Sequence, residues 1–240
     1  MLEARKVSVR FNGLVALDTV DLTLEKGEIL GLIGPNGSGK TTLLNVLSGF
    51  VKPATGTVRV DGRDVTGRPP LELSRLGVGR TFQSVRLFRG LTVLENVTLG
   101  ALGRGASRQT AAVRARALLD QLGLIDRASL KAGTLPYGDQ RTVALARTVA
   151  SAPNYLLLDE PAAGLNDRES DELLATLTRL HRDSGFGIII IEHDMRLLMT
   201  LCQRIHVLDG GKTLAVGSPE AIRSDPRVIE AYLGAPLEAA

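Results

Sequence analysis

The amino-acid sequence predicts an α/β fold: a parallel sheet covered by helices on both faces, with a small antiparallel β subdomain and an inserted α-helical subdomain. Three observations support this prediction. Short apolar runs alternate with helical patterns, which is typical of buried parallel strands. The N-terminal segments alternate apolar and polar residues, as half-buried strands do. The middle of the chain has a helical pattern throughout.

The predicted strands of the parallel sheet are short, near-continuous runs of apolar residues. In chain order they are 28–34, 155–161, 187–194 and 204–211. A glycine-rich loop follows the first of them, and the sequence KTTLLNVLSGF then predicts a helix. The antiparallel part is expected from the alternating segments 5–11, 20–28 and 56–65.

The helical pattern runs from about residue 92 to residue 150. Within it, the segment 107–123 predicts a helix that ends at Gly123. Its expected apolar side consists of Val113, Leu118, Leu119 and Leu122. We therefore expect one domain over 1–240, in which 1–91 and 151–240 form the α/β core and 92–150 form the helical subdomain.

Composition limits the class of protein. The 240 residues are 44% hydrophobic and 23% charged, which is typical of a globular chain with a sizeable core. The net charge of +3 is too small to indicate a nucleic-acid partner. The single cysteine, Cys202, excludes an internal disulfide and is interpreted as a small buried apolar residue in a reducing compartment.

No targeting or membrane-spanning segment is evident. The N-terminal sequence MLEARKVSVRF lacks the apolar stretch of a signal peptide. No run approaches the roughly 18 apolar residues that a membrane helix needs. We expect a cytosolic protein that can attach to a membrane through a partner.

The sequence GPNGSGKTT matches the phosphate-binding loop G-x-x-x-x-G-K-[ST] between a predicted strand and a predicted helix. Glycines let the backbone wrap around phosphate, and the helix N-terminus favours negative charge. Lys40 is expected to reach the β- and γ-phosphates, and the Thr41 hydroxyl to bind Mg²⁺. The candidate nucleotide-binding residues are Gly34, Pro35, Asn36, Gly37, Ser38, Gly39, Lys40, Thr41 and Thr42.

A second acidic element completes such a site. The run LLLDEP ends in Asp159 and Glu160, at the end of a strand where ligands bind in parallel sheets. Asp159 is expected to face Mg²⁺, directly or through water. Glu160 is the candidate general base that activates the attacking water.

These elements, in this order, resemble the ATP-binding-cassette (ABC) ATPases over essentially the whole chain. The resemblance implies a P-loop NTPase (RecA-like) core, with ATP and Mg²⁺ as ligands. It implies that Gln83, in TFQ, contacts Mg²⁺ and senses the γ-phosphate. It also implies that His193 is the switch histidine at the γ-phosphate and that Phe11 stacks on adenine.

In the ABC family a Leu-Ser-Gly-Gly-Gln signature contacts the ATP of the partner subunit, and a loop after the catalytic glutamate crosses the dimer interface. The resemblance places the signature at Leu135, Pro136, Tyr137, Gly138 and Asp139, and the interface loop at Gly164, Leu165 and Asn166.

The signature departs from the family pattern. Pro136 has neither a hydroxyl nor an N–H, and Tyr137 cannot adopt a positive φ cheaply. Asp139 replaces Gln and is a candidate to accept hydrogen bonds from ribose. Asn166 replaces an Asp of the interface loop and loses its charge. We hypothesise that the ATP site completed by this signature is weaker than the site on the chain's own phosphate loop.

The stretches RTFQSVRLFRGLTVLENV, DEPAAGLN and GSPEAIRSDPRVIEAYLGA narrow the resemblance to the larger-type ATPase of branched-chain (LIV-type) amino acid importers. This implies a heterodimer with a second ABC ATPase subunit, two transmembrane permease subunits and, indirectly, a solute-binding protein. It implies a peripheral position at the cytoplasmic face of the inner membrane. Importers of urea, amides and other small solutes have similar ATPases.

Three other readings are open. A soluble ABC protein of DNA repair or translation usually has two cassettes or a long coiled-coil insertion, and this chain has one cassette. A kinase or GTPase with a phosphate loop would need an acceptor site or a guanine-reading motif. A non-hydrolysing regulatory module is disfavoured by Glu160 and His193.

Overall fold

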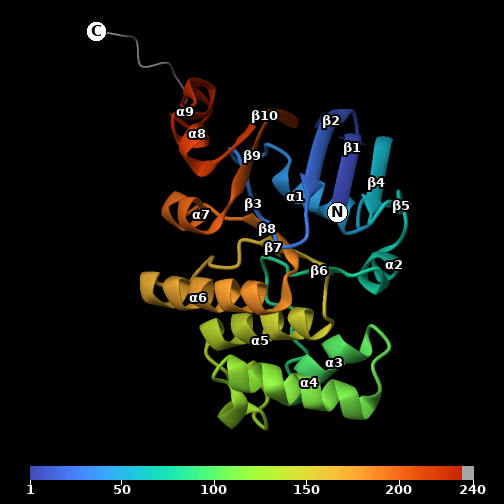
Figure 1. The fold of residues 1–240 in the computed structure, drawn as a ribbon, viewed down its shortest axis with the longest axis vertical. Helices are drawn as coiled ribbons and strands as arrows, with labels where there is room; N and C mark the ends of the chain where they lie inside the picture. The colour runs from blue at the N-terminus through green and yellow to red at the C-terminus, as the bar shows by residue number, and fades with distance from the viewer. Residues whose placement is uncertain (234–240) are drawn as a thin grey trace.

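A computed structural model describes residues 1–233, which form two sheets and a set of helices (Figure 1). The antiparallel sheet has the strand order β2-β1-β4-β5. Its strands are β1 (Leu2–Phe11), β2 (Leu14–Leu24), β4 (Thr55–Val60) and β5 (Arg63–Asp64). The larger sheet has the order β10-β9-β3-β8-β7-β6. Its strands are β3 (Ile29–Ile33), β6 (Val78–Arg80), β7 (Tyr155–Asp159), β8 (Gly187–Ile191), β9 (Arg204–Asp209) and β10 (Lys212–Gly217). All of its pairings are parallel except β10 with β9.

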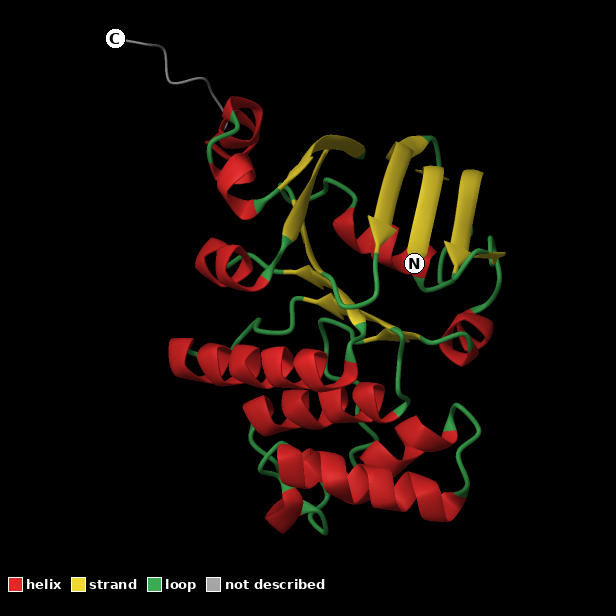
Figure 2. Ribbon diagram, viewed as in Figure 1, coloured by secondary structure: helices red, strands yellow, loops and turns green. Residues whose placement is uncertain are grey.

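The helices fall into groups along the chain. Helix α1 (Lys40–Leu47) and the short α2 (Pro70–Arg75) belong to the N-terminal part. The middle of the chain contributes α3 (Val93–Leu102), α4 (Arg108–Gln121) and α5 (Tyr137–Ala150), with short 3-10 turns at Ile125–Arg127 and Ala132–Thr134. The C-terminal part contributes α6 (Asp167–Ser184), α7 (Met195–Leu201), α8 (Pro219–Arg223) and α9 (Pro226–Leu233). Figure 2 shows α3 to α6 stacked together at the end of the molecule opposite the antiparallel sheet.

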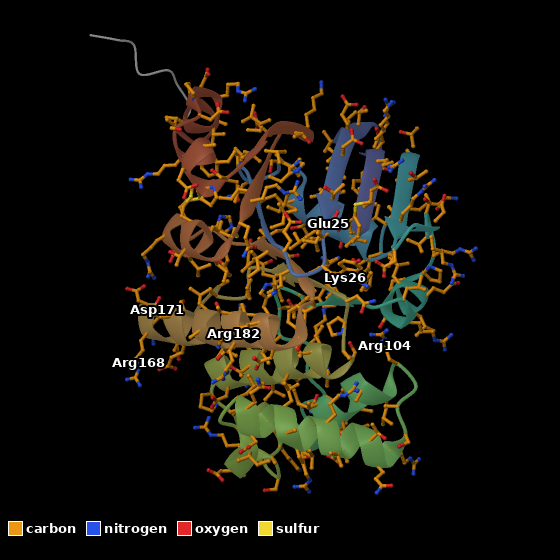
Figure 3. The ribbon with its side chains drawn as sticks, viewed as in Figure 1. Glu25, Lys26, Arg104, Arg168, Asp171 and Arg182 are labelled. Carbon is orange, nitrogen blue, oxygen red and sulfur yellow. The ribbon has the colours of Figure 1, made fainter. Side chains whose placement is uncertain are left out.

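Two apolar cores lie on opposite faces of the larger sheet, because successive strand residues point to opposite sides. On one face, Leu30 and Leu32 pack with α1 and the antiparallel sheet. On the other face, Ile29 and Ile33 pack with the helices from α3 to α7. The long α6 presents Leu173, Leu177 and Leu180 to this second core. Its opposite side is charged: Arg168 and Asp171 lie toward one end of the helix and Arg182 toward the other (Figure 3).

The predicted strands and the helix after the glycine-rich loop are confirmed, although most are shorter than expected: α1 ends at Leu47, for example. One prediction about the helical part is wrong. Val113 is 64% exposed and does not belong to the apolar side of α4. The buried side of that helix consists of Ala111, Ala115, Leu118 and Leu119. Two small alanines, which carry a weak hydrophobic signal, define the face because α4 packs closely on α3 and α5.

Three further findings bear on predictions made from the sequence. No helix in residues 1–233 combines the length and the apolar character needed to span a membrane. Cys202 is buried as predicted, and burial raises the pKa of its thiol to about 12. The last two residues of the C-terminal stretch used for the LIV-type resemblance, 234 and 235, lie outside the described residues.

Candidate active site

The glycine-rich segment forms a tight loop between β3 and α1. Gly34, Gly37 and Gly39 all have positive φ, at 149°, 81° and 102°. A Cβ on Gly34 would lie 2.0 Å from the Leu208 carbonyl oxygen, and one on Gly39 would lie 2.7 Å from that of Ala16. Only glycine fits these two positions, because the backbone of neighbouring strands leaves no room for a side chain.

The polar groups of the loop point inward. Lys40 donates hydrogen bonds from Nζ to the carbonyl oxygens of Gly34, at 2.7 Å, and Pro35, at 2.9 Å. Burial lowers the pKa of Lys40, while the nearby Glu160 and Asp159 carboxylates oppose this shift. Ser38 Oγ is buried and has no hydrogen-bond partner among residues 1–233. A buried ammonium and an orphan hydroxyl in a loop of this shape suit an anionic phosphate ligand.

Outside this buried part, Asn36 and Gly37 form the exposed tip of the loop, and Thr41 is exposed in the first turn of α1 with Thr42 partly exposed beside it. Phe11 is 46% exposed at the end of β1, beside the turn into β2. The loop and this hairpin are neighbours, since β2 supplies the Ala16 carbonyl next to Gly39.

Asp159 ends β7 and forms a buried ion pair with Arg80, which ends the neighbouring β6. The distance from Arg80 Nη2 to Asp159 Oδ2 is 3.2 Å, and the two side chains are 5% and 6% exposed. Arg80 Nη1 also donates to Asn45 Oδ1 in α1, at 2.7 Å, and to Ser48 Oγ, at 2.8 Å. Ser48 is the residue that caps the C-terminus of α1. Burial raises the pKa of Asp159, and the Arg80 guanidinium opposes the shift.

Arg80 was not expected from the sequence, although it adjoins the TFQ motif. Its guanidinium lies over the rings of Phe50 and Phe82, at 5.6 and 4.9 Å from their centroids. The same side chain therefore connects the glutamine segment, the acidic strand and α1. Cation–π and ionic contacts of this kind join residues that are close in the fold but have no fixed spacing in the sequence. They therefore leave no sequence pattern from which Arg80 could be predicted.

The structure brings together the three predicted catalytic residues. Gln83 Nε2 donates to Glu160 Oε2 at 2.7 Å, and His193 Nε2 lies 3.0 Å from Glu160 Oε1. Glu160 has a φ of 50°, and its N–H donates to the Ile191 carbonyl at 3.0 Å. A left-handed conformation in a non-glycine residue costs energy and persists where the surroundings fix it. Here it aims the Glu160 side chain between the other two residues.

Glu192 is a second residue that the sequence analysis missed. Its side chain is 7% exposed and accepts hydrogen bonds from the backbone N–H groups of Ala162, at 2.6 Å, and His193, at 3.3 Å. Burial raises the pKa of this carboxyl, and the two N–H donors oppose the shift. Glu192 thereby ties the loop after β7 to the loop after β8. An acidic residue next to a predicted switch histidine was the available signal.

The signature stretch forms the start of α5. Leu135 is 6% exposed, Pro136 is the N-cap, and Tyr137 is the first helical residue. Tyr137 does not adopt a positive φ: among residues 1–233, six non-glycine residues have one, and Tyr137 is not among them. Asp139 forms an ion pair with Arg127 of the same chain. The carboxylate is therefore engaged within the subunit.

Arg141, one turn further along α5, links the signature to the acidic strand. Its Nη1 donates to the carbonyl oxygens of Glu160, at 2.8 Å, and Pro161, at 2.7 Å. Its Nη2 donates to the Gln83 carbonyl, at 3.3 Å. A buried arginine with three backbone acceptors fixes the position of α5 relative to the catalytic residues.

The interface loop lies next to the signature. Gly164 is exposed with a φ of 80°, and a Cβ there would be 3.4 Å from the Tyr137 ring. Leu165 is partly buried against the second core. Asn166 is the N-cap of α6: its Oδ1 accepts from the Glu169 N–H, and Glu169 Oε2 accepts from the Asn166 N–H, both at 3.0 Å. This capping box explains why Asn is suited to this position.

The family model described as "ABC transporter" matches residues 17–163. The chain belongs to this family. A second model, described as "Branched-chain amino acid ATP-binding cassette transporter", matches residues 212–237. The resemblance inferred from the motifs is therefore confirmed. The chain is an ATPase of the kind whose hydrolysis is coupled to transport, and ABC ATPases work as dimers with membrane permease subunits.

Individual proteins extend this finding. The chain is 44% identical to the high-affinity branched-chain amino acid transport ATP-binding protein LivG of Salmonella typhimurium, with 98% of each chain covered. An ABC-transporter ATP-binding cassette in its ADP conformation superposes with a TM-score of 0.88 and 31% identity over 98% of both chains. A dimeric cassette bound to ADP and Pi has a TM-score of 0.81 and 28% identity over 91% of this chain and 99% of that one. The predicted P-loop NTPase fold is thus confirmed. Domains of this family bind nucleotide.

Proposed function

We propose that this chain is the ATP-hydrolysing motor subunit of an importer for branched-chain amino acids. The observation that carries the proposal is the contact of Gln83 and His193 with Glu160 beside an intact phosphate loop, because a nucleotide-binding module without turnover needs no such group. The substrate class is supported by the similarity to LivG over 98% of the chain and by the match of the C-terminal segment.

In the proposed reaction, the N–H groups of the loop and Lys40 bind the phosphates and stabilise the charge that develops on them. Glu160 accepts a proton from the attacking water as the water oxygen bonds to the γ-phosphorus. The bond from that phosphorus to the β–γ bridging oxygen breaks, and ADP leaves with this oxygen. His193 and Gln83 orient the Glu160 carboxylate through the hydrogen bonds already described. Phe11 is proposed to stack on the adenine, consistent with its exposed position.

Mg²⁺ is proposed as the metal, with Thr41, Gln83 and Asp159 as its protein-side contacts. Residues 1–233 contain no group of three or more His, Cys, Asp or Glu side chains that could hold a metal ion. This suits Mg²⁺, which is usually bound by one or two protein oxygens together with substrate phosphates. Arg80 engages Asp159 through Oδ2, which is compatible with a metal contact through Oδ1. When bound with ATP, the metal would supply positive charge that offsets the negative charge of the phosphates.

We further propose that this chain pairs with a second, different ABC ATPase subunit, and that the signature residues 135–139 contact the nucleotide of that subunit. The N-terminus of α5 is suited to this role: Tyr137 is 47% exposed, and no side chain caps the helix at Pro136. Its free N–H groups and dipole favour a phosphate from another chain. Gly164, Leu165 and Asn166 would lie in the same interface.

The remaining partners are two permease subunits and, indirectly, a solute-binding protein, with the chain at the cytoplasmic face of the membrane and no nucleic acid involved. The segment after Gln83 and the helices α3 to α5 are the proposed permease contact. Exposed apolar side chains there support this assignment: Phe88 is 56% exposed and Leu99 is 38% exposed.

The experiment is co-purification of the chain with its permease and binding protein, followed by reconstitution in vesicles. ATP hydrolysis and solute uptake are measured with leucine, valine, urea and an amide as competing substrates. We expect leucine or valine to stimulate hydrolysis and to accumulate. Stimulation by urea or the amide alone would favour the alternative importer class, and hydrolysis without any permease association would favour a soluble ABC ATPase.

A further inference from the structure

The C-terminal helix reaches the phosphate loop through one side chain. Helix α9 packs on α8 and β10 and lies at the C-terminal end of the described chain (Figure 1). The hydroxyl oxygen of Tyr232 accepts a hydrogen bond from the Gly34 N–H at 2.8 Å, across 198 residues of sequence. Gly34 is the first residue of the loop, so α9 touches the loop at its start.

Two further contacts constrain Gly34. Its Cα lies against the Leu208 carbonyl, where a Cβ would come within 2.0 Å, and its own carbonyl accepts the hydrogen bond from Lys40. The Gly34 carbonyl is therefore one of two acceptors that position the Lys40 ammonium, together with the Pro35 carbonyl. A group that fixes the Gly34 N–H also helps to position Lys40.

The C-terminal part of the chain holds the loop at a second point. The Gly211 N–H, in the turn between β9 and β10, donates to the Ser38 carbonyl at 3.1 Å. This is a backbone contact at a glycine with a φ of 79°, where a Cβ would lie 2.8 Å from the Ala16 carbonyl oxygen. The contact of Tyr232 is made by a side chain, and therefore depends on the residue at this position.

The side chain of Tyr232 is 45% exposed, and its ring has a position that does not depend on the hydroxyl oxygen alone. It forms part of the wall of an apolar groove with Met195, Met199, Ile222 and Val228. Phenylalanine would keep these ring contacts and lose only the oxygen. Burial raises the pKa of the Tyr232 hydroxyl, with the Gly34 N–H opposing the shift, so the group stays neutral at physiological pH.

We propose that Tyr232 is a positioning residue for the nucleotide site: its hydroxyl fixes the Gly34 N–H and thereby preorganises the phosphate loop around Lys40. Tyr232 touches no reacting atom. A buried N–H without an acceptor is costly, and a loop that must be reordered on binding loses affinity. This role gives the C-terminal helix a part in ATP binding that the phosphate-loop, glutamine, signature and switch motifs do not include.

The test is Tyr232→Phe in the full chain, with affinity for a fluorescent ATP analogue measured by titration and unfolding followed in parallel. We expect binding to weaken about 3- to 10-fold, with the KM for ATP rising in proportion. The kcat at saturating ATP and the Tm should change little. Ile229→Ala is the matched control, because Ile229 is a half-exposed residue of α9 that lines the same groove.

Hydrogen exchange of the Gly34 amide is a second measurement, and it remains informative if Tyr232→Phe lowers the stability of the whole protein. In ¹⁵N-labelled protein the Gly34 amide should exchange faster in Tyr232→Phe relative to the Leu32 amide of β3, and not in Ile229→Ala. Wild-type affinity with unchanged Gly34 exchange in Tyr232→Phe would overturn the proposal. An equal loss of affinity in Ile229→Ala would overturn it too, because packing of α9 would then explain the effect.

Discussion

The phosphate loop and the signature stretch differ in how their own chain supports them. The loop is buried between strands and is held by Leu208, Gly211 and Tyr232 from the C-terminal part. The signature lies at an exposed helix start: Pro136 provides no side-chain cap, and the Tyr137 ring is about half exposed. In the proposed ATP site, one half is thus complete within a single subunit, and the other half is an open surface.

The glycines of the two stretches illustrate this difference. A Cβ at Gly34 would collide with backbone at 2.0 Å, whereas a Cβ at Gly138 would first meet the Glu169 carboxylate at 3.2 Å, which can move aside. Gly34 is therefore required by its own fold. Gly138 is not required in this way, and its small size is consistent with the nucleotide contact proposed for the signature.

The largest expected effect comes from removing the proposed base in the complete half. Glu160→Gln keeps the shape of the side chain and its contact with His193 but removes a proton acceptor. We expect kcat for ATP hydrolysis to fall at least about 100-fold, while ATP binding is retained. Phosphate release is the measurement, and Glu172→Gln, on the exposed side of α6, is the control. Undiminished phosphate release would remove Glu160 from its assigned role.

Breaking the buried ion pair between Arg80 and Asp159 tests how much this pair contributes to the stability of the complete half. Arg80→Met leaves Asp159 buried without its partner, which costs about 3–5 kcal/mol in comparable cases. The free energy of unfolding, measured in urea, should fall by an amount of this order. Arg168→Met removes an exposed pair with Glu172 and should cost no more than about 0.5 kcal/mol. Equal losses in the two variants would contradict the importance given to Arg80.

We expect the free energy of unfolding to fall at acidic pH because of one buried histidine, His206. Burial lowers the pKa of His206, which lies on β9 beside Leu32 of β3, to about 4. The unfolded chain, with a pKa near 6.5 at this residue, therefore binds the proton first as the pH falls. The stabilisation is complete above about pH 6.5 and is lost progressively toward pH 4, by about 2 kcal/mol between pH 7 and pH 5.

Urea unfolding at several pH values measures this effect. His206→Gln should flatten the pH dependence in that window, because the titrating group is absent. The wild-type chain, measured over the same pH range, is the comparison. An unchanged slope in His206→Gln would show that other groups cause the acid sensitivity.

The smallest effect is expected in the open half. Pro136→Ser supplies a side chain that can cap α5, worth about 1 kcal/mol, and restores a hydroxyl and an N–H for a partner's phosphate. ATP-dependent dimerisation should tighten, as measured by sedimentation in a Glu160→Gln background. Pro69→Ser is a matched control, because Pro69 is also an uncapped N-cap, at α2. If dimerisation does not change, the weakness assigned to this signature is wrong.

The sequence predicts much of the fold and of the candidate site. It predicts the phosphate loop and the acidic strand because the residues of each motif are neighbours in the chain, such as Gly39 with Lys40 and Asp159 with Glu160. Four apolar strands were predicted for a similar reason, since burial on both faces gives an unbroken apolar run.

The missed features depend on contacts between distant segments. Arg80 is the last residue of a three-residue strand, which is too short to give a pattern, and its partner Asp159 is 79 residues away in the sequence. Tyr232 contacts Gly34 from the other end of the chain. The buried face of α4 includes Ala111 and Ala115 and not the predicted Val113, because the neighbouring helices α3 and α5, and not the sequence of α4 alone, decide which residues are small enough to be buried there.

Cys202 has a practical consequence for testing the two halves. It is 6% exposed and its thiol stays protonated near neutral pH, so thiolate-directed labels will react slowly with it. It is the one cysteine in the sequence. The native chain thus behaves as a cysteine-free background for spectroscopy. A single cysteine introduced near the exposed signature could carry a spin label or a fluorophore and report directly on when the second subunit arrives.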